Sequence, residues 1–374
     1  MFLFLAALFF FIALFPYLMY LAGIYFGKKS VSAIALQTFP AISIIISAYN
    51  EELVIKKRIA NIQECHYPKE KIEIIFVDDC SSDNTKNLAK LYLERSGISY
   101  HLIENTERLG TTRSYNTALT TAQYPIIVTT DADVFFEPDA LKNLIGRLFS
   151  DEKIAAVTGE LRPLKNAQST TLLEGVYRSF YGRMCEWESA HDSTYNFNGA
   201  LVAFRSDLIK RINDKRGADD ANTAFEAIRK GYRAVYERKA IVYEDVPRSF
   251  NTQYRQKTRR ATGLIEATLS NLDLLGGKTP FSRFFYPLRI FIYLGTPVLF
   301  FVGLVFFSIG IILYNPIVIL LLFFVLILLG IFWRQNLLFA FIINQFYLLT
   351  GLLNLGKDMR VWESTSDKKK GKSS

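Results

Sequence analysis

Cysteine and histidine are scarce in this sequence of 374 residues, which contains 3 of each. The cysteines, at Cys65, Cys80 and Cys185, lack the paired spacing of zinc sites and disulfide frameworks, and this pattern indicates a reducing, cytosolic environment. The sequence also lacks a Gly-rich Walker loop and a Gly-x-Gly-x-x-Gly segment after its first predicted strand. Neither an ATPase nor a dinucleotide enzyme is therefore supported.

No charged side chain occurs from Met1 to Phe26. A helix of this length rises by roughly 1.5 Å per residue and can span a hydrocarbon core of about 30 Å. Lys28 and Lys29 follow the apolar run instead of preceding it. This order argues against a cleaved signal peptide and places the next residues in the cytoplasm. We therefore expect a transmembrane helix at the start of the chain.

A second apolar block extends from about Phe284 to Leu355 and is interrupted near residues 314–316 and 333–336. Three crossings would place the lysine-rich tail outside the cell. The basic tail, together with Arg334 at the second interruption, favours two crossings followed by a segment that lies in the membrane interface.

These segments predict a multi-pass protein of the cell (plasma) membrane with a cytoplasmic central domain. The formal net charge of +9 suits contact with anionic membrane lipids, and nucleic acid is not an expected partner. The expected units are a transmembrane helix (1–27), a central domain (38–247), an amphipathic interface region (248–283), C-terminal membrane helices (284–356) and a basic tail (357–374).

The central domain alternates short β-branched runs with amphipathic stretches, which is typical of βαβ units around a mostly parallel sheet. We therefore predict an α/β domain. The predicted strands cover residues 42–47, 72–77, 99–103 and 125–130, and the predicted helices cover residues 51–65, 83–95, 112–122 and 138–149.

Acidic residues follow three of the predicted strands, with Glu51 after the first, Asp79 after the second, and Asp131 and Asp133 after the fourth. In an open α/β sheet, ligands bind at the carboxyl ends of the strands, so we expect these side chains at one rim. Their oxygens suit Mg²⁺ or Mn²⁺ bound together with a diphosphate. Helix capping before Pro138 is the alternative explanation of the Asp-x-Asp pair.

An adjacent acidic pair, Asp219 and Asp220, precedes a predicted helix over residues 221–230. A carboxylate in this position can act as a general base, and it can also simply cap the helix. The basic run from Arg248 to Arg260 allows two interpretations as well. It either contacts lipid headgroups or clamps a diphosphate.

The order of these segments, from about Pro40 to Gly263, resembles that of the family 2 glycosyltransferases, which are inverting enzymes that use a nucleotide sugar. The flanking apolar helices resemble those of the membrane-bound branch that includes hyaluronan, cellulose and poly-N-acetylglucosamine synthases. The resemblance implies a GT-A fold, a Rossmann-like nucleotide-diphospho-sugar transferase domain, flanked by transmembrane helices. It also implies a divalent metal, Mn²⁺ or Mg²⁺, as cofactor.

The resemblance implies a nucleotide site at the first strand ends. The segment Ile-Ile-Ser-Ala-Tyr-Asn-Glu-Glu resembles the opening strand and loop of the family, which would place Tyr49 near the base and Glu51 at the nucleotide. The segment Val-Asp-Asp-Cys-Ser-Ser-Asp would make Asp79 the partner of the base. Asp131-Ala132-Asp133 matches the Asp-x-Asp motif, so that Asp133 would bind the metal and Asp131 the sugar nucleotide.

The acceptor side is implied by two further motifs. The segment from Asn198 and Gly199 to Ala200 resembles the glycine-bearing turn beside the acceptor. Ala-Asp-Asp resembles the Thr-Glu-Asp motif, whose last carboxylate is the base. This match makes Asp220 the expected catalytic base, with Asp219 beside it in the substrate site.

Two segments depart from the pattern of the family. Residues 109–116 resemble its Gly-Lys-x-x-Ala-Leu-Asn segment, but threonine replaces the lysine, and Arg113 is the candidate for that charge. Gln256 and Arg259 match Gln-x-x-Arg-Trp, and Arg259 is expected to face the diphosphate. Arg260, however, stands where tryptophan would stack on the acceptor sugar. The loss of this aromatic platform argues against a long sugar polymer as acceptor.

The resemblance thus implies inverting transfer from a nucleotide-diphosphate sugar to a hydroxyl of a lipid-linked or otherwise membrane-associated acceptor. Uridine diphosphate is the usual carrier in the family, and guanosine diphosphate is the alternative. A processive polysaccharide synthase that extends and exports a glycan is a second hypothesis. A membrane scaffold that retains the fold without turnover is a third. The sugar, the linkage and the oligomeric state stay open.

Overall fold

The computed structural model describes residues 1–27, 33–164, 169–214, 217–245, 249–314 and 337–357, together with the single positions 317 and 324. The strands are β1 (Ile42–Ala48), β2 (Ile72–Asp78), β3 (Ser99–Glu104), β4 (Ile126–Asp131), β5 (Val134–Phe136), β6 (Ile154–Pro163), β7 (Val202–Arg205) and β8 (Arg233–Glu244). The helices are α1 (Phe2–Phe26), α2 (Ile55–Gln63), α3 (Thr85–Glu94), α4 (Thr111–Leu119), α5 (Ala140–Leu148), α6 (Ser169–His191), α7 (Asp219–Arg229), α8 (Phe250–Ser270), α9 (Tyr286–Ile290), α10 (Thr296–Tyr314) and α12 (Leu337–Leu353).

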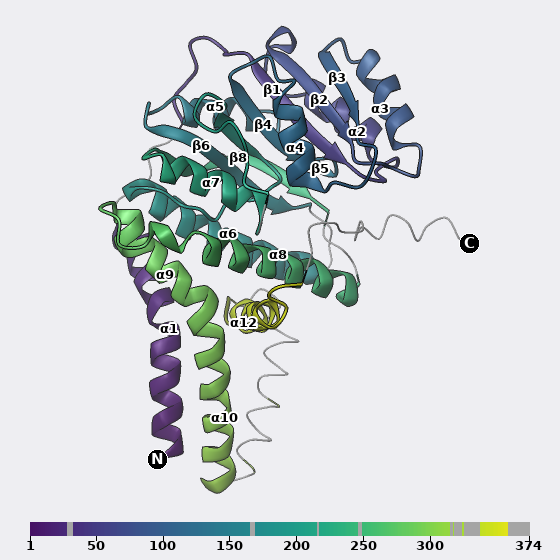
Figure 1. Ribbon diagram of the computed structural model, residues 1–374. Helices are drawn as coiled ribbons and strands as arrows, with labels where there is room; N and C mark the ends of the chain where they lie inside the picture. The colour runs from purple at the N-terminus through teal and green to yellow at the C-terminus, as the bar shows by residue number, and fades with distance from the viewer. Residues whose placement is uncertain are drawn as a thin grey trace, which may run out of the picture.

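The strands of the described residues form one eight-stranded sheet in the order β3-β2-β1-β4-β7-β6-β8-β5 (Figure 1). The first four strands run parallel to one another. Strand β7 is antiparallel to both β4 and β6, and β5 is antiparallel to β8. The α/β class predicted from the sequence is confirmed, and the four predicted strands form the parallel half of the sheet.

Both faces of the sheet are covered by helices, as strand β1 illustrates. Ile44 and Ile46 belong to one apolar core, whereas Ile45 belongs to the core on the opposite face. Helices α2, α3 and α5 complete the first core, and α4, α6 and α7 contribute to the second. A strand buried on both faces is expected to be mostly apolar along its length instead of alternating with polar residues. This strand accordingly has the sequence Ile-Ser-Ile-Ile-Ile-Ser-Ala.

None of the predicted helices begins at the residue predicted, as α5 illustrates. Helix α5 starts at Ala140 with Asp139 as its N-cap, so Pro138 precedes the helix instead of standing in its first turn. Helix α8 begins at Phe250 and includes the basic residues from 255 to 260. Its start is fixed by Ser249, whose Oγ accepts a hydrogen bond of 3.1 Å from the Thr252 N–H.

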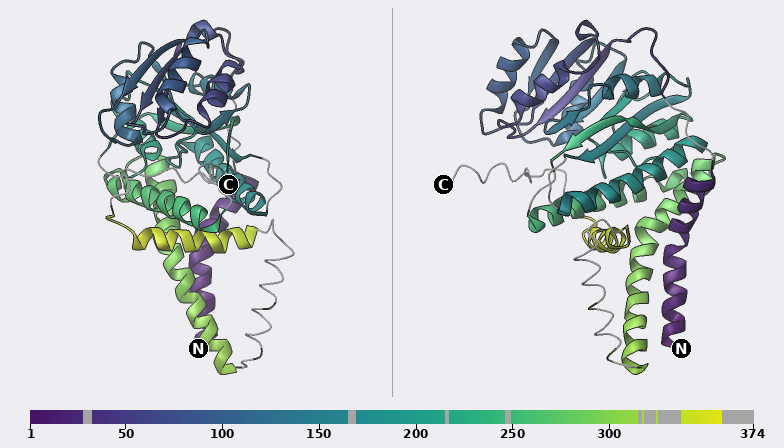
Figure 2. Two further views of the ribbon diagram at one scale, coloured as in Figure 1. Left: turned by 90° about the vertical axis from the view of Figure 1, so that its right-hand side faces the viewer. Right: turned by 180° about the vertical axis from the view of Figure 1, so that it is seen from behind.

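Two helices among the described residues are long and apolar enough to cross a membrane: α1 and a continuous helix from Phe281 to Tyr314 that includes α9 and α10. They lie side by side and extend away from the sheet (Figure 2). Glycines permit this close packing, because a Cβ at Gly303 or Gly310 would lie 3.0 Å or less from side chains of α1. The second apolar segment of the C-terminal block lies outside the described residues.

Helix α12 has a different orientation from these two helices. It packs against α8 and lies roughly across the directions of α1 and α10 (Figure 2, left). Its side chains Leu338, Phe346 and Leu353 are exposed, whereas Ala340 and Gln345 are buried. The last apolar segment is thus a separate helix packed against α8, and its position in the membrane interface stays a prediction.

The first turn of α7 is held against α8 through a close approach of the two backbones. Gly217 has φ of +83°, a left-handed conformation that favours glycine. A Cβ at Gly217 would lie 2.5 Å from the backbone N of Ala267. The Ala218 N–H donates a hydrogen bond of 3.1 Å to the Gly263 carbonyl. The positions of Asp219 and Asp220 therefore depend on how tightly α8 packs.

The substitution Gly217→Ala is expected to lower the free energy of unfolding by about 2–4 kcal/mol, because backbone strain and a collision with α8 add together. Gly231→Ala is the matched control, since Gly231 has φ of +81° but a methyl group added there would meet nothing within 4 Å. The control should lose only about 1 kcal/mol. Thermal unfolding of the purified full chain measures both, and equal losses would contradict the packing argument.

Candidate active site

The carboxyl ends of β1, β2 and β4 meet at one rim of the sheet. In the register of the strands, Ala48 pairs with Asp78 and Ser47 pairs with Asp131. The acidic residues that follow these strands are therefore neighbours, as the sequence predicted. Glu51 is buried at the same rim, where its N–H donates a hydrogen bond of 2.7 Å to the Thr85 hydroxyl.

Asp79 organises the loop that follows β3. Its carboxylate is buried and accepts hydrogen bonds from the Asn105 side chain at 2.8 Å and from the Leu109 and Gly110 N–H groups at 2.9 and 3.0 Å. Arg108 adds an ion pair, with its Nε 3.3 Å from Oδ2. A carboxylate with this many donors fixes the loop from residue 105 to residue 110 beside the nucleotide site predicted from the sequence.

Arg108 also covers the ring of Tyr49, with its guanidinium carbon 3.2 Å from the ring centroid. The aromatic residue predicted to lie near the base is thus stacked with a cation. Arg113, which was expected to replace the missing lysine, is half exposed and pairs instead with Asp214 at 3.7 Å. Arg108 is the residue of this segment that the structure brings to the rim.

Gly199 lies close to two of the predicted functional carboxylates. A Cβ at this position would lie 3.9 Å from Oδ2 of Asp131 and 4.0 Å from Oδ2 of Asp220. The absent side chain therefore leaves a gap that both carboxylates face. Asn198 precedes this glycine and donates a hydrogen bond of 2.6 Å from its amide to the Gly159 carbonyl. Its buried Oδ1 has no hydrogen-bond partner among the described residues.

Burial and mutual repulsion shift the ionisation of this acidic group. Burial, followed by the charges of Asp133 and Asp219, raises the pKa of Asp131 well above its ordinary value. Burial also raises the pKa of Asp219. For Asp220, burial and the neighbouring charge of Asp219 raise the pKa to about 7, although its Oδ1 accepts a hydrogen bond of 2.7 Å from the Ala221 N–H.

Basic residues of α8 face the acidic group. Burial lowers the pKa of Arg259 to about 10, whereas the charges of Asp131 and Asp219 act in the opposite direction. Burial would lower the pKa of Arg260 as well, but its ion pair with Glu244 raises it above the ordinary value. Arg260 thus carries a fixed positive charge at the position where the family motif has tryptophan.

Arg260 is one end of a chain of alternating charges whose acidic members are buried, and we call it the α6–α8 ion chain. Arg178 links its two acidic members, with Nη2 2.8 Å from Glu244 and Nε 2.7 Å from Glu174. Gln256 contributes a hydrogen bond of 3.4 Å to Glu244. Burial would raise the pKa of Glu244, but the two arginines lower it to about 2. The members of the chain are Lys257, Glu174, Arg178, Glu244 and Arg260.

Residues 43–210 match the family model described as glycosyl transferase family 2. This chain contains a family 2 glycosyltransferase domain. The sheet with its rim of carboxylates has the GT-A fold. Over 238 residues the chain is 29% identical to the Bacillus subtilis protein named Probable glycosyltransferase YdaM, covering 61% of this chain and 56% of the relative. Over 232 residues it is 25% identical to the Staphylococcus aureus poly-beta-1,6-N-acetyl-D-glucosamine synthase, covering 61% and 55%.

The chain therefore spans about half the length of these two relatives. A solved structure is similar over nearly the whole chain: the mannosyltransferase PcManGT from Pyrobaculum calidifontis, in complex with GDP-Man and Mn²⁺. The two structures superpose with a TM-score of 0.78 at 25% identity, covering 95% of this chain and 98% of the other. The likeness thus includes the apolar helices as well as the family 2 domain.

The carboxylates of the family 2 domain fit a divalent cation held jointly with a diphosphate. Asp131 and Asp133 offer hard oxygen ligands, and the raised pKa of Asp131 reflects a crowding of negative charge that a cation would relieve. Among the described residues, no group of three or more His, Cys, Asp or Glu side chains is arranged to hold a metal alone. Phosphate oxygens of a donor would complete the ligands, as is usual for Mg²⁺.

Arg58 is a residue of the site that the sequence analysis did not identify. It is fully buried on α2, and its Nη2 donates a hydrogen bond of 2.8 Å to the Thr130 hydroxyl, which itself donates one of 2.7 Å to the Ala200 carbonyl. Burial lowers its pKa to about 10, while Asp131 and Asp133 favour its charged form. The feature of the sequence that could have identified Arg58 was its position on the apolar face of the predicted helix.

Tyr115 on α4 was also not identified. It is 1% exposed, and its hydroxyl has no hydrogen-bond partner among the described residues. Burial, followed by the charges of Asp131, Asp219 and Asp220, raises its pKa. A neutral tyrosine hydroxyl therefore lies within electrostatic range of the acidic group.

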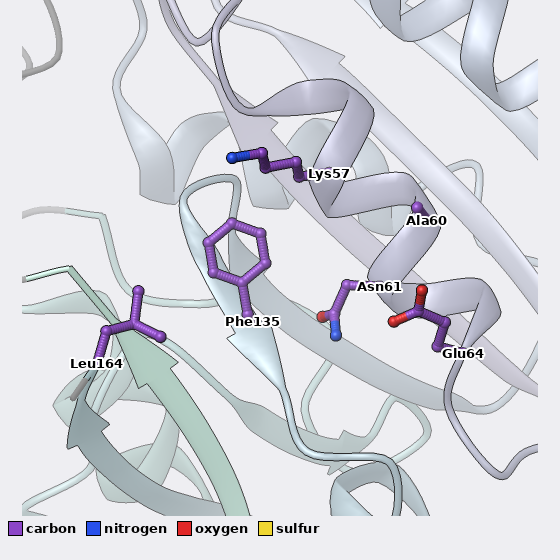
Figure 3. Close-up of a pocket in the computed structure, with 6 residues that line it drawn as sticks. All are labelled: Lys57, Ala60, Asn61, Glu64, Phe135 and Leu164. Carbon is purple, nitrogen blue, oxygen red and sulfur yellow. The ribbon is translucent and has the colours of Figure 1, made fainter. Parts of the chain in front are cut away.

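A separate groove of about 400 Å³ lies between α2, β5 and the end of β6 (Figure 3). Its lining contains none of the functional carboxylates described above. Figure 3 shows the ring of Phe135 between the side chains of α2 and Leu164. The residues that line it are Lys57, Ala60, Asn61, Glu64, Phe135 and Leu164.

Removing the central acid of the α6–α8 ion chain is expected to destabilise the domain. Glu244→Gln removes one of the two counter-ions of the buried Arg178 and the counter-ion of the more exposed Arg260, which should lower the free energy of unfolding by about 2–3 kcal/mol. Because the folded-state pKa of Glu244 is about 2, this stabilisation is present above roughly pH 4.3 and is lost as pH falls toward 2. The difference between wild type and variant should shrink accordingly.

Glu226→Gln is the matched control, because Glu226 pairs with Arg229 at 3.1 Å on the surface of α7. An exposed pair of this kind contributes at most about 1 kcal/mol. Unfolding by denaturant at neutral and acidic pH compares the two variants. Similar losses for both, or a loss for Glu244→Gln that does not depend on pH, would show that the chain is not a stabilising unit.

Proposed function

We propose that this protein is an inverting glycosyltransferase that moves a sugar from a nucleotide-diphosphate sugar to a hydroxyl of a lipid-linked or otherwise membrane-associated acceptor. The observation that carries the proposal is the gap at Gly199, where an added Cβ would lie 3.9 Å from Oδ2 of Asp131 and 4.0 Å from Oδ2 of Asp220. Inversion requires a base and a site for the leaving group on opposite sides of the reacting carbon. We assign the base to Asp220 and the leaving-group side to Asp131, since both carboxylates border the space at Gly199.

Asp220 is the proposed general base. Its raised pKa, about 7, makes it a better proton acceptor than an ordinary aspartate while it still ionises near neutral pH. It would remove the proton of the acceptor hydroxyl as that oxygen bonds to the anomeric carbon and the bond to the diphosphate breaks. Asn198, whose buried Oδ1 is unpartnered among the described residues, is positioned to accept a hydrogen bond from a bound sugar.

The leaving diphosphate would be held by Asp131 and Asp133 together with a bound Mg²⁺ or Mn²⁺, which neutralises its developing charge. Arg259 is the proposed basic contact of the diphosphate from α8. Arg58 keeps the strand end of Asp131 and the turn after Gly199 in a fixed relation through Thr130. On the nucleotide side, Tyr49 and Asp79 with Arg108 are the proposed contacts of the base.

The acceptor is proposed to be membrane-associated because the two apolar helices and α12 lie directly beneath the helices that carry the acceptor side of the site (Figure 1). Confinement of enzyme and acceptor to one surface raises their effective concentration. We further propose that the protein resides in the plasma membrane as a multi-pass protein, with the family 2 domain in the cytoplasm, consistent with Lys28 and Lys29 after α1.

The donor is proposed to be a uridine or guanosine diphosphate sugar. Uridine diphosphate is the usual carrier of the family, whereas the similar solved mannosyltransferase contains GDP-Man and Mn²⁺. A processive synthase is the second candidate, since one relative is a poly-beta-1,6-N-acetyl-D-glucosamine synthase. Arg260, engaged by Glu244, replaces the aromatic platform that a growing polymer would use. Product length therefore separates the two candidates.

The first test measures release of nucleoside diphosphate by the purified full chain in lipid, with a panel of uridine and guanosine sugars, Mn²⁺ or Mg²⁺, and membrane extract as acceptor source. Metal-dependent release from one donor is expected. Asp220→Asn should reduce it by about a hundredfold or more while donor binding persists, and Asp133→Ala should weaken binding itself. Asp207→Asn, on an exposed turn, is the matched control. Release that survives both site variants would exclude the assignment.

The rate of transfer should also depend on pH through Asp220. A base must be ionised to accept a proton, so a pKa of about 7 predicts a rate that falls as pH decreases below 7 and levels off above it. Initial rates between about pH 5.5 and 8.5, at saturating donor, measure this profile. A rate that stays constant across that interval would assign the proton transfer to another group.

A further inference from the structure

The residues 192–200, which we call the 192–200 loop, connect α6 to β7 and carry Asn198 and Gly199. The loop is tightly turned before this point, since the Phe197 N–H donates a hydrogen bond of 2.8 Å to the Tyr195 carbonyl. The Asn198 N–H donates to the Thr158 hydroxyl at 3.3 Å. The segment is short and is held by these hydrogen bonds. A displacement of Asn196 would therefore also displace Gly199.

The 192–200 loop is anchored by the helix that enters the apolar region. The Phe281 N–H donates a hydrogen bond of 2.9 Å to Asp192 Oδ2. Tyr195 packs against the rings of Tyr286 and Tyr293, with centroids 5.4 and 6.4 Å apart. The Tyr293 hydroxyl donates a hydrogen bond of 3.1 Å to Asn196 Oδ1. Three residues of the helix from Phe281 to Tyr314 therefore hold the segment that leads to Gly199.

The bond between Tyr293 and Asn196 belongs to a closed ring of buried polar groups. Arg289 donates to the Tyr293 hydroxyl at 3.1 Å and to Cys185 Sγ at 3.5 Å. Asn196 donates to the same sulfur at 3.6 Å, which closes the ring. These side chains are buried or nearly so, and each depends on its neighbours for its orientation.

This ring is also tied to the first apolar helix. Arg289 Nε lies 2.6 Å from Glu188 on α6, and both side chains are 1% exposed. The Tyr20 hydroxyl of α1 donates to the same Glu188 oxygen. A buried ion pair contributes little net stability compared with an apolar replacement, and its best-attested use is to fix one arrangement of its neighbours. The two views of Figure 2 show the tops of both apolar helices meeting one end of α6.

We propose that Tyr293 is a positioning residue of the active site, through which the membrane helices set the place of Gly199 close to Asp131 and Asp220. The apolar helices are thus part of the assembly of the site and not only its tether. This inference rests on the proposed function, because it assigns the 192–200 loop to the acceptor side of the transfer reaction.

The test compares Tyr293→Phe with Tyr286→Phe in the full chain in lipid. Both residues are fully buried on the same helix, and each variant loses one hydroxyl. The Tyr286 hydroxyl donates 2.6 Å to the Thr268 carbonyl of α8 and not to the loop. Tyr293→Phe should lower kcat about tenfold or more while the KM for the donor changes less than about twofold. Tyr286→Phe should keep kcat near that of the wild type.

Hydrogen exchange of the 192–200 loop gives a readout that does not require turnover. Exchange should become faster in Tyr293→Phe and in Asn196→Ala, but not in Tyr286→Phe. The double variant of Tyr293 and Asn196 should lose less kcat than the product of the two single losses, because the two changes share one bond.

The proposal is overturned if Tyr293→Phe and Tyr286→Phe have equal kcat, or if loop exchange rises while kcat is unchanged. Should the wild type release no nucleoside diphosphate with any donor, the proposed function fails. The exchange comparison alone then decides the anchoring, and equal exchange in the two tyrosine variants would overturn it.

Discussion

Repulsion among carboxylates gathered at one edge of the sheet is the constraint on which the rest of the site depends. Asp131, Asp133, Asp219 and Asp220 come from two distant parts of the chain, and burial removes the water that would screen them. Such a group persists only if fixed positive charges surround it and a cationic ligand can enter it. The arginines of α2 and α8, with the α6–α8 ion chain behind them, supply that surrounding charge.

This constraint explains why α8 is a helix along its whole length. A loop of basic residues would place its charges in water, where they would have little effect on the buried acids. On a helix packed beneath the sheet, Arg259 faces Asp131 and Asp219, while Arg260 is fixed by Glu244. The same packing requires Gly217, because a Cβ there would lie 2.5 Å from the backbone N of Ala267 on α8. Charge compensation and backbone packing are therefore parts of one arrangement.

Much of this arrangement could be predicted from the sequence, because it depends on local patterns. Strands β1 to β4 are β-branched runs between turn residues, and the carboxylates follow them directly, so topology alone places them at one edge. The ion chain could not be predicted, since Glu174 and Glu244 lie far apart in sequence and meet only through Arg178. Arg58 was missed because an arginine on an amphipathic helix is usually solvated. Arg113 was expected at the site because of its position in the sequence motif. The tertiary fold brings Arg108 to Tyr49.

The aromatic cluster around Tyr195 contains side chains from both the family 2 domain and the apolar helices. Tyr195 stacks on Phe225 of α7 with ring centroids 4.5 Å apart, and Phe281 and Tyr286 cover the same rings from the helix that enters the apolar region. A domain cut away before Phe281 would expose these rings to water and leave Asp192 and Asn196 without their bonds. The second apolar core of the family 2 domain thus continues into the apolar helices, and exchanging one part for another sequence would expose apolar surface of the other.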